Sequence, residues 1–511
     1  MEETRTKNSV RNIFFSMIYY IIQMVLTFIV RVLFLRVFIV DFLGVNQLFS
    51  NILTILSVVE SGFGSAVIFA LYKPVAENDE TKVRQLVRLY KKYYTIIGIV
   101  VGCLGIIIIP FLPYLINNFY EIDLNLYVMF CIFLATSLMT YVTAHRRALF
   151  YTSQRNDIET KINIVGYFVT VGIQLLSILV FKNYYVYALA GFINVVVVNI
   201  LIIYVTNKRY KRFILKPDTA IDKSESKKIT QNVFALFYHK IGGVVLTATD
   251  SLILSAFVGV TIVGKYANYL LITTYLNTIM AMFIGSIKGS VGNSIATESV
   301  EQNHKLFSKL NMLYLLINSF ATICFISLAN PFISFFFGSE MLLSVGAVIL
   351  IGINMFLYNL RQIVYVFKDC KGLFKENKYA PLIEATLNLV LSIILVRYLG
   401  LVGVVLGTII SCIMVPLWNE PYILNKHYFK KSTFKYLLKL IISVLLVFIV
   451  GVLAFFIIGL IPGGNVGFIL LKFIICGLVV AALLLLAFCA TKDFKESLGF
   501  VKNLFKGLKK K

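Results

Sequence analysis

The chain has 511 residues, of which 59% are hydrophobic and only 14% are charged, whereas soluble domains carry about 25% charged residues. A soluble protein is therefore excluded, and apolar runs of about 18–25 residues along the whole chain indicate transmembrane helices. The net charge of +24 does not indicate nucleic-acid binding, because the basic residues lie in every second loop.

Fourteen apolar spans are predicted, which makes the chain an all-α integral membrane protein. We interpret the first as an uncleaved span, because its apolar run is much longer than the core of a signal peptide. The spans cover residues 13–40, 44–72, 93–116, 124–144, 162–181, 185–206, 231–257, 263–287, 310–329, 343–367, 380–396, 401–421, 437–459 and 468–490.

The lysine and arginine residues set the predicted orientation. With the N-terminus in the cytoplasm, the cytoplasmic segments hold 40 of the 48 basic residues. Cytoplasmic loops of membrane proteins are enriched in such residues, so both termini are predicted to face the cytoplasm. The connections on the other side are short, and no outer domain is expected to hold a catalytic site.

The first two spans each carry one ionisable residue at membrane depth, Arg31 and Glu60. Because a charge there costs about 2.5–3.5 kcal/mol on insertion scales, both are candidates for a substrate or ion cavity. Gln23 and Thr27 share the helix face of Arg31, and Asn51 shares that of Glu60. The alternative is that these polar stripes pack helix against helix.

Segments of the first half recur in the second half. Ala76, Leu86 and Tyr94 correspond to Ala296, Leu306 and Tyr314 at an offset of 220, and FLGV at residues 42–45 corresponds to FVGV at 257–260. We therefore predict two pseudo-symmetric six-helix lobes, a layout of alternating-access transporters. The predicted parts are an N-lobe (1–206), a cytoplasmic linker (207–230), a C-lobe (231–424), spans 13 and 14 (425–491) and a basic cytoplasmic tail (492–511).

The second half carries its own polar residues inside the predicted spans. They are Lys240, Thr247 and Asp250 in the seventh span, Asn354 and Arg361 in the tenth, and Glu384 and Asn388 in the eleventh. Intramembrane cations suit a substrate with an anionic head such as a diphosphate, and the carboxylates are candidates for a coupling ion. Each of these roles has an alternative that remains open. For Lys240, the alternative is that the side chain extends to the cytoplasmic edge of the membrane. For Arg361 and Glu384, it is an ion pair between helices.

No enzyme motif is present, neither HExxH nor a P-loop. The seven cysteines are scattered and lack metal-ligand spacing. We therefore expect a transporter without catalytic residues, cofactor or metal site, and an anionic amphiphile is favoured as its substrate. Pro416 and Pro421 are expected to kink the twelfth span, and the segment from Phe494 is expected to form an amphipathic helix on anionic lipid.

Two regions resemble a known family, the Wzx-type polysaccharide repeat-unit flippases of the multidrug/oligosaccharidyl-lipid/polysaccharide exporter superfamily. The segments DFLGVNQLF at residues 41–49 and VESGFGSA at residues 59–66 resemble the start of that family's sequences. The family's eleventh and twelfth spans are resembled by KGLF at 371–374, PLIEATLNLVLS at 381–392 and GLVGVVLGT at 400–408.

The resemblance implies two six-helix lobes in a V, with helices 13 and 14 packed outside them. It implies a flippase that moves undecaprenyl-diphosphate-linked oligosaccharide repeat units across the bacterial cytoplasmic membrane for capsule or exopolysaccharide synthesis. Arg31 matches the family's first-span cavity cation, whereas Lys240, Asp250 and Arg361 match only by helix. Expected partners are the lipid-linked oligosaccharide, anionic membrane lipids, and the polymerase and glycosyltransferases of the same pathway, without nucleic acid.

Other functions remain as alternatives to that expectation. The same architecture suits a teichoic-acid flippase, a lipid II flippase or a cation-coupled multidrug exporter. A membrane polysaccharide polymerase or ligase is disfavoured, because such an enzyme needs an outer catalytic loop that the short outer connections do not supply.

Overall fold

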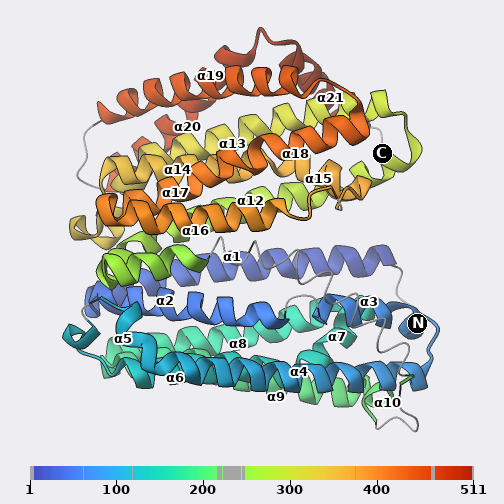
Figure 1. Cartoon of the computed structure of the whole chain (residues 1–511), viewed down its shortest axis with the longest axis vertical. Helices are drawn as coiled ribbons and strands as arrows, with labels where there is room; N and C mark the ends of the chain where they lie inside the picture. The colour runs from blue at the N-terminus through green and yellow to red at the C-terminus, as the bar shows by residue number, and fades with distance from the viewer. Residues whose placement is uncertain are drawn as a thin grey trace. The chain divides into compact units, whose positions relative to one another are not determined.

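The computed structural model describes residues 5–60, 63–117, 119–215, 221–222, 243, 248–374, 376–461 and 466–508. Every regular element in these ranges is helical, which confirms the predicted all-α fold. The chain forms two compact units, Met1–Gly264 and Lys265–Lys511 (Figure 1). This division falls after the predicted linker, and the domain boundaries drawn from the sequence stay a prediction.

The first unit begins with the helix that carries Arg31. Its elements are α1 (Arg5–Val37), α2 (Val40–Leu56), η1 (Ser57–Glu60), α3 (Phe63–Ala76), α4 (Glu80–Ile108), η2 (Ile109–Phe111), α5 (Leu112–Leu115), η3 (Phe119–Glu121), α6 (Leu126–Tyr141), α7 (Ala144–Thr152), α8 (Asn156–Leu176), η4 (Ser177–Phe181), α9 (Tyr184–Arg209), α10 (Lys211–Ile214) and the helix Ala248–Phe257. Within this unit, α1 packs on α8, and α9 packs on both α6 and α8.

The long helix α12 (Val260–Thr297) leads from the first unit into the second. The second unit continues with α13 (Val300–Phe337), η5 (Ser339–Met341), α14 (Val345–Leu360), α15 (Gln362–Lys371), α16 (Ala380–Leu399), α17 (Leu401–Met414), α18 (Pro416–Leu424), η6 (Asn425–Phe429), α19 (Thr433–Gly459), α20 (Val466–Phe488) and α21 (Lys492–Leu508). Here α13 is central, because α14, α19, α20 and α21 all pack against it.

The helices support a multi-pass membrane protein. Among the described residues, eleven helices are long and apolar enough to cross a membrane, or twelve if the bent pair α6–α7 is one span. The other two of the fourteen predicted spans, the second and the seventh, correspond to shorter apolar helices. The outer faces of the long helices are apolar and exposed, as at Phe448 (66%) and Phe456 (68%) of α19, which suits contact with lipid.

The second predicted span differs from the continuous helix expected over residues 44–72. The helix α2 ends at Leu56, Glu60 lies in the 3₁₀ turn η1, and α3 begins at Phe63. At the first residue of the turn, the Ser57 hydroxyl donates to the Thr54 carbonyl at 2.8 Å. The regular helix is therefore interrupted at the residue singled out for function, where such a side-chain bond accompanies the change from the α-helical to the 3₁₀ pattern.

Breaks at matching positions support the predicted duplication. The fourth span bends by 46° between α6 and α7, and the tenth is interrupted at Arg361 between α14 and α15. The second segments of these spans begin at Ala144 and Gln362, 218 residues apart, close to the offset of the sequence repeat. The expected effect of Pro416 is also confirmed, because α17 ends at Met414 and α18 begins at this proline.

Two segments with similar sequences, residues 42–45 and 257–260, lie in contact. A Cβ atom added to Gly44 of α2 would lie 2.0 Å from the carbonyl oxygen of Val260 in the first turn of α12. One added to Gly264 would lie 2.3 Å from the carbonyl oxygen of Val40. The Thr261 hydroxyl donates to the Asp41 carboxylate at 2.6 Å beside this crossing. The two backbones therefore approach as closely as only glycine permits.

We expect the substitution Gly44→Leu to destabilise the protein strongly. Overpacking typically costs about 1–3 kcal/mol, and here the obstacle is rigid backbone rather than a side chain that can rotate. The midpoint of thermal unfolding, followed by size-exclusion chromatography of heated detergent samples, measures the loss. The control is Gly346→Leu in α14, where an added Cβ meets nothing within 4 Å. Wild-type stability of Gly44→Leu would contradict the close crossing.

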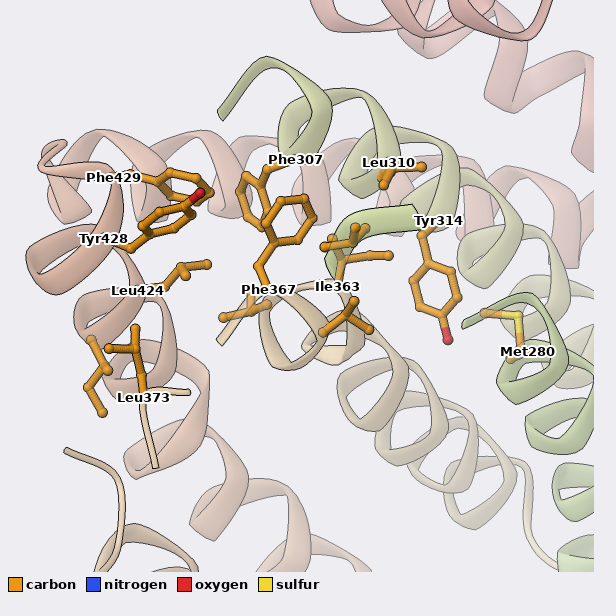
Figure 2. Close-up of a cluster of buried hydrophobic side chains, with 14 residues drawn as sticks. Met280, Phe307, Leu310, Tyr314, Ile363, Phe367, Leu373, Leu424, Tyr428 and Phe429 are labelled. Carbon is orange, nitrogen blue, oxygen red and sulfur yellow. The ribbon is translucent and has the colours of Figure 1, made fainter. Parts of the chain in front are cut away.

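An aromatic cluster forms the core at one end of the second unit (Figure 2). The ring of Phe307 from α13 lies 5.3 Å from that of Phe367 in α15 and 5.3 Å from that of Phe429 in η6, centroid to centroid. All three side chains are buried. Offset and edge-on aromatic pairs add to the free energy of burial, so this cluster holds three separate elements together.

Candidate functional site

Arg31 lies in the C-terminal third of α1 and is partly buried. Its guanidinium is near the hydroxyl of Tyr187 in α9. The Tyr187 ring lies 4.8 Å from the ring of Phe34 and stacks on Tyr184 at 5.9 Å. Arg31 therefore lies beside an aromatic cluster, and residues 12–35 of this helix hold no other charged side chain.

The polar residues one and two turns earlier on α1 contact α8. The hydroxyls of Thr27 and Tyr167 are 2.6 Å apart, and the Tyr167 hydroxyl also donates to the backbone carbonyl of Gln23 at 3.3 Å. This contact is the helix-to-helix packing that the sequence left open for these positions. It orients the face of α1 that also carries Arg31.

Glu60 lies among tyrosines of α4 and α6. Its carboxylate is close enough to act electrostatically on the hydroxyls of Tyr90, Tyr94 and Tyr141, and Tyr141 is within hydrogen-bond reach of it. The rings of Tyr90 and Tyr94 are 4.7 Å apart, and those of Tyr94 and Tyr141 are 5.9 Å apart. A carboxylate in a broken helix, with one tyrosine hydroxyl in hydrogen-bond reach and two more nearby, is chemically suited to hold a cation or a proton.

The other predicted site residues of the first unit are Asn51, Asp250, Lys240 and Thr247. Asn51 of α2 accepts a hydrogen bond from the side-chain amide of Gln47 at 3.4 Å. Asp250 is buried in the short helix Ala248–Phe257 and is 8% exposed. Lys240 and Thr247 lie outside the described residues.

Arg361 and Glu384 form a buried ion pair in the second unit. The Arg361 guanidinium, in the break between α14 and α15, donates to the Glu384 carboxylate of α16 at 3.0 Å, and the two residues are 9% and 6% exposed. The Cys412 sulfur of α17 lies 3.9 Å from the same guanidinium. The sequence left open whether Arg361 and Glu384 line the cavity or pair with each other, and the structure shows the ion pair.

A second buried ion pair, not predicted from the sequence, lies in the same region. Lys368 of α15 lies 3.6 Å from the Glu420 carboxylate of α18, and the two residues are 3% and 1% exposed. Lys368 falls one residue beyond the predicted tenth span (343–367), but it follows Arg361 by two helical turns and so lies on nearly the same face. This spacing of seven residues from Arg361 is the feature of the sequence that could have identified Lys368 as a buried residue.

The remaining predicted polar residues of the second unit are Asn388 and Asn354. Asn388 is fully buried, and its side-chain amide donates to the Thr408 hydroxyl at 2.9 Å, which ties α16 to α17. Asn354 is partly buried in α14. Within the described residues, no group of three or more His, Cys, Asp or Glu side chains is arranged to hold a metal ion.

The N-terminal half also matches a known family. A profile of the family described as "Polysaccharide biosynthesis protein" matches residues 9–288, which is more than half of the chain and includes the first unit from residue 9 onward. The chain belongs to the polysaccharide biosynthesis protein family. No curated protein matches it.

Solved structures show which fold the chain has. A lipid II flippase, MurJ, in an inward-closed conformation is similar with a TM-score of 0.68 and 15% identity, over 92% of this chain and 98% of that chain. An inward-facing multidrug-resistance MATE transporter of the MOP superfamily gives 0.64 and 14%, over 80% and 96%. A MOP-superfamily transporter from Pyrococcus furiosus gives 0.53 and 14%, over 84% and 98%. The chain therefore has the fold of these transporters, as the resemblance implied.

Proposed function

We propose that the protein is a flippase that moves undecaprenyl-diphosphate-linked oligosaccharide repeat units across the bacterial cytoplasmic membrane, for capsule or exopolysaccharide synthesis. Membership of the polysaccharide biosynthesis family and the transporter fold support a flippase rather than an enzyme. In this proposal, both termini face the cytoplasm, the lobes alternate between inward and outward access, and the polymerase and glycosyltransferases of the pathway are partners.

The observation that carries the proposal is the cation of Arg31 within an apolar membrane helix. A guanidinium at that depth costs about 2.5–3.5 kcal/mol on insertion scales, and a diphosphate offers it charge-assisted, bidentate hydrogen bonds. We assign Arg31 as the principal diphosphate contact. Arg361 is engaged by Glu384, so it is a secondary candidate together with Lys240.

Glu60 and Asp250 are the proposed coupling carboxylates of the first unit. Glu60 has the hydroxyl groups of three tyrosines around it, which suits the reversible binding of a cation or a proton. Glu384 is less suited to that role, because its charge is neutralised by Arg361.

A second candidate is a lipid II flippase. The likeness to MurJ extends over 92% of the chain, and lipid II also carries a diphosphate that Arg31 would contact. At 15% identity, the likeness to MurJ shows the fold and does not select a substrate. The two candidate substrates both carry a diphosphate and differ in the sugar that is attached to it.

Deletion of the gene is expected to accumulate a lipid-linked oligosaccharide inside the cell, because its synthesis continues while its exit is blocked. Mass spectrometry of extracted lipids identifies the sugar and separates the two candidates. An oligosaccharide repeat unit on the lipid supports the proposal, whereas accumulated lipid II with normal surface polymer would favour the second candidate. Complementation with the wild-type gene is the control.

A further inference from the structure

A cavity of about 250 Å³ opens in the second unit, where α13, α19 and α21 meet. Its walls include His304 and Phe307 of α13, Lys435 and Lys439 of α19, the preceding Lys431, and Asp493 of α21. The volume equals about eight water molecules at roughly 30 Å³ each, enough for a phosphate group with its immediate substituents. None of the residues assigned to the diphosphate lies in it.

The lining of this cavity is basic. It holds three lysines and one carboxylate, and the single carboxylate, Asp493, is paired with Lys439. In the part of the chain that the structure describes, no acidic side chain pairs with Lys431 or Lys435, and both lysines are exposed. The excess positive charge therefore faces an open cavity, which fits an anion.

A second cavity of about 250 Å³ continues from the first along α19. The two share Lys435, Lys439 and Asp493, but the second is lined mainly by apolar side chains, among them Leu438 and Ile442. These two are 49% and 52% exposed on a membrane helix. The lysines thus stand between a polar pocket and an apolar groove that is open to lipid.

We propose that these two cavities form a binding site for one anionic phospholipid, with the phosphate between Lys431 and Lys435 and an acyl chain along α19. Charge complementarity favours an anionic head, and the adjoining apolar groove favours a lipid over a soluble anion. Basic pockets between transmembrane helices on the cytoplasmic side bind anionic lipid heads in this way. The site does not depend on the proposed transport function.

The floor of the site is rigid, and its lid is the C-terminal helix. Phe307 belongs to the aromatic cluster of Figure 2, and Tyr436, also in the lining, packs against that cluster. The lid α21 is held to α13 by the Ser497 hydroxyl, which donates to the Lys309 carbonyl at 3.2 Å. A bound lipid would therefore link α19 and α13 through the tail helix, whose sequence predicted contact with anionic lipid.

The test is a lipid titration of the full chain in detergent, read by native mass spectrometry. The probes are phosphatidylglycerol, phosphatidylcholine with the same acyl chains, and soluble glycerol phosphate. We expect one phosphatidylglycerol to be retained, and neither of the other probes. The variant Lys431→Gln/Lys435→Gln is expected to bind phosphatidylglycerol about 25-fold more weakly, at about fivefold for each lysine lost near the membrane surface.

Two further variants keep the result interpretable. Asp493→Asn removes the only carboxylate of the lining and is expected to strengthen phosphatidylglycerol binding, an effect that misfolding cannot produce. Lys208→Gln/Lys211→Gln, two exposed lysines at the junction of α9 and α10, removes the same charge elsewhere and is expected to change nothing. Unchanged binding by the first double variant, an equal loss in the control, or equally tight glycerol phosphate binding would overturn the proposal.

Discussion

Replacing Arg31 with glutamine is expected to abolish surface polymer while the amount of folded protein in the membrane stays at the wild-type level. The guanidinium provides charge-assisted hydrogen bonds to the diphosphate, each worth about 1.5–3 kcal/mol. Losing two of them corresponds to at least a 100-fold reduction in transport. The substitution makes the membrane helix α1 less polar, so the stability of the protein is not expected to fall.

Two substitutions control for the role of Arg31. Arg36→Gln removes the same charge from the last turn of the same helix, where the side chain is exposed, and polymer is expected to remain. Arg31→Lys keeps the charge but loses the planar fork, so partial transport is expected. Surface polymer is quantified by immunoblot, and protein by a C-terminal tag. Normal polymer in Arg31→Gln would remove this residue from the diphosphate site.

Replacing Glu384 with leucine is expected to destabilise the protein by about 3–5 kcal/mol, because it leaves the buried Arg361 guanidinium without its counter-charge. The pair is joined at 3.0 Å, and both side chains are at least 90% buried. Substituting both partners, as Arg361→Met/Glu384→Leu, is expected to recover most of this loss, since an apolar pair of similar volume avoids the burial of charge. Thermal unfolding in detergent measures both variants.

The exposed pair of Glu301 and Lys305 provides the matched control. Their charged groups are 3.4 Å apart, with side chains 74% and 62% exposed, and Glu301→Leu is expected to change stability by less than about 0.5 kcal/mol. A double variant as unstable as Glu384→Leu alone would show that the loss has another cause. If the double variant is stable but does not transport, Arg361 also contacts substrate, the role first assigned to it from the sequence.

The class of fold could be predicted from residues considered locally. The length of each apolar run predicts a span without reference to any other part of the chain, and twelve of the fourteen predicted spans have long or bent helical counterparts. The breaks were less predictable. Pro416 signals an interruption by its missing N–H. The end of α2 at Leu56 has no such local signal, because the Ser57–Thr54 bond found there also occurs at Ser286 within the continuous helix α12.

For the candidate site, the sequence alone determined which residues are out of place: Arg31, Glu60, Asp250, Arg361 and Glu384 are ionisable groups within apolar spans, and the cost of burying a charge marks them wherever they point. Only the tertiary structure decided what each of them meets. Arg361 meets Glu384, Glu60 meets three tyrosines, and Lys368 meets Glu420 across 52 residues of chain. The reason is physical: hydropathy is a property of one segment, whereas an ion pair depends on the rotation and depth of two helices, which are set by packing along their whole length.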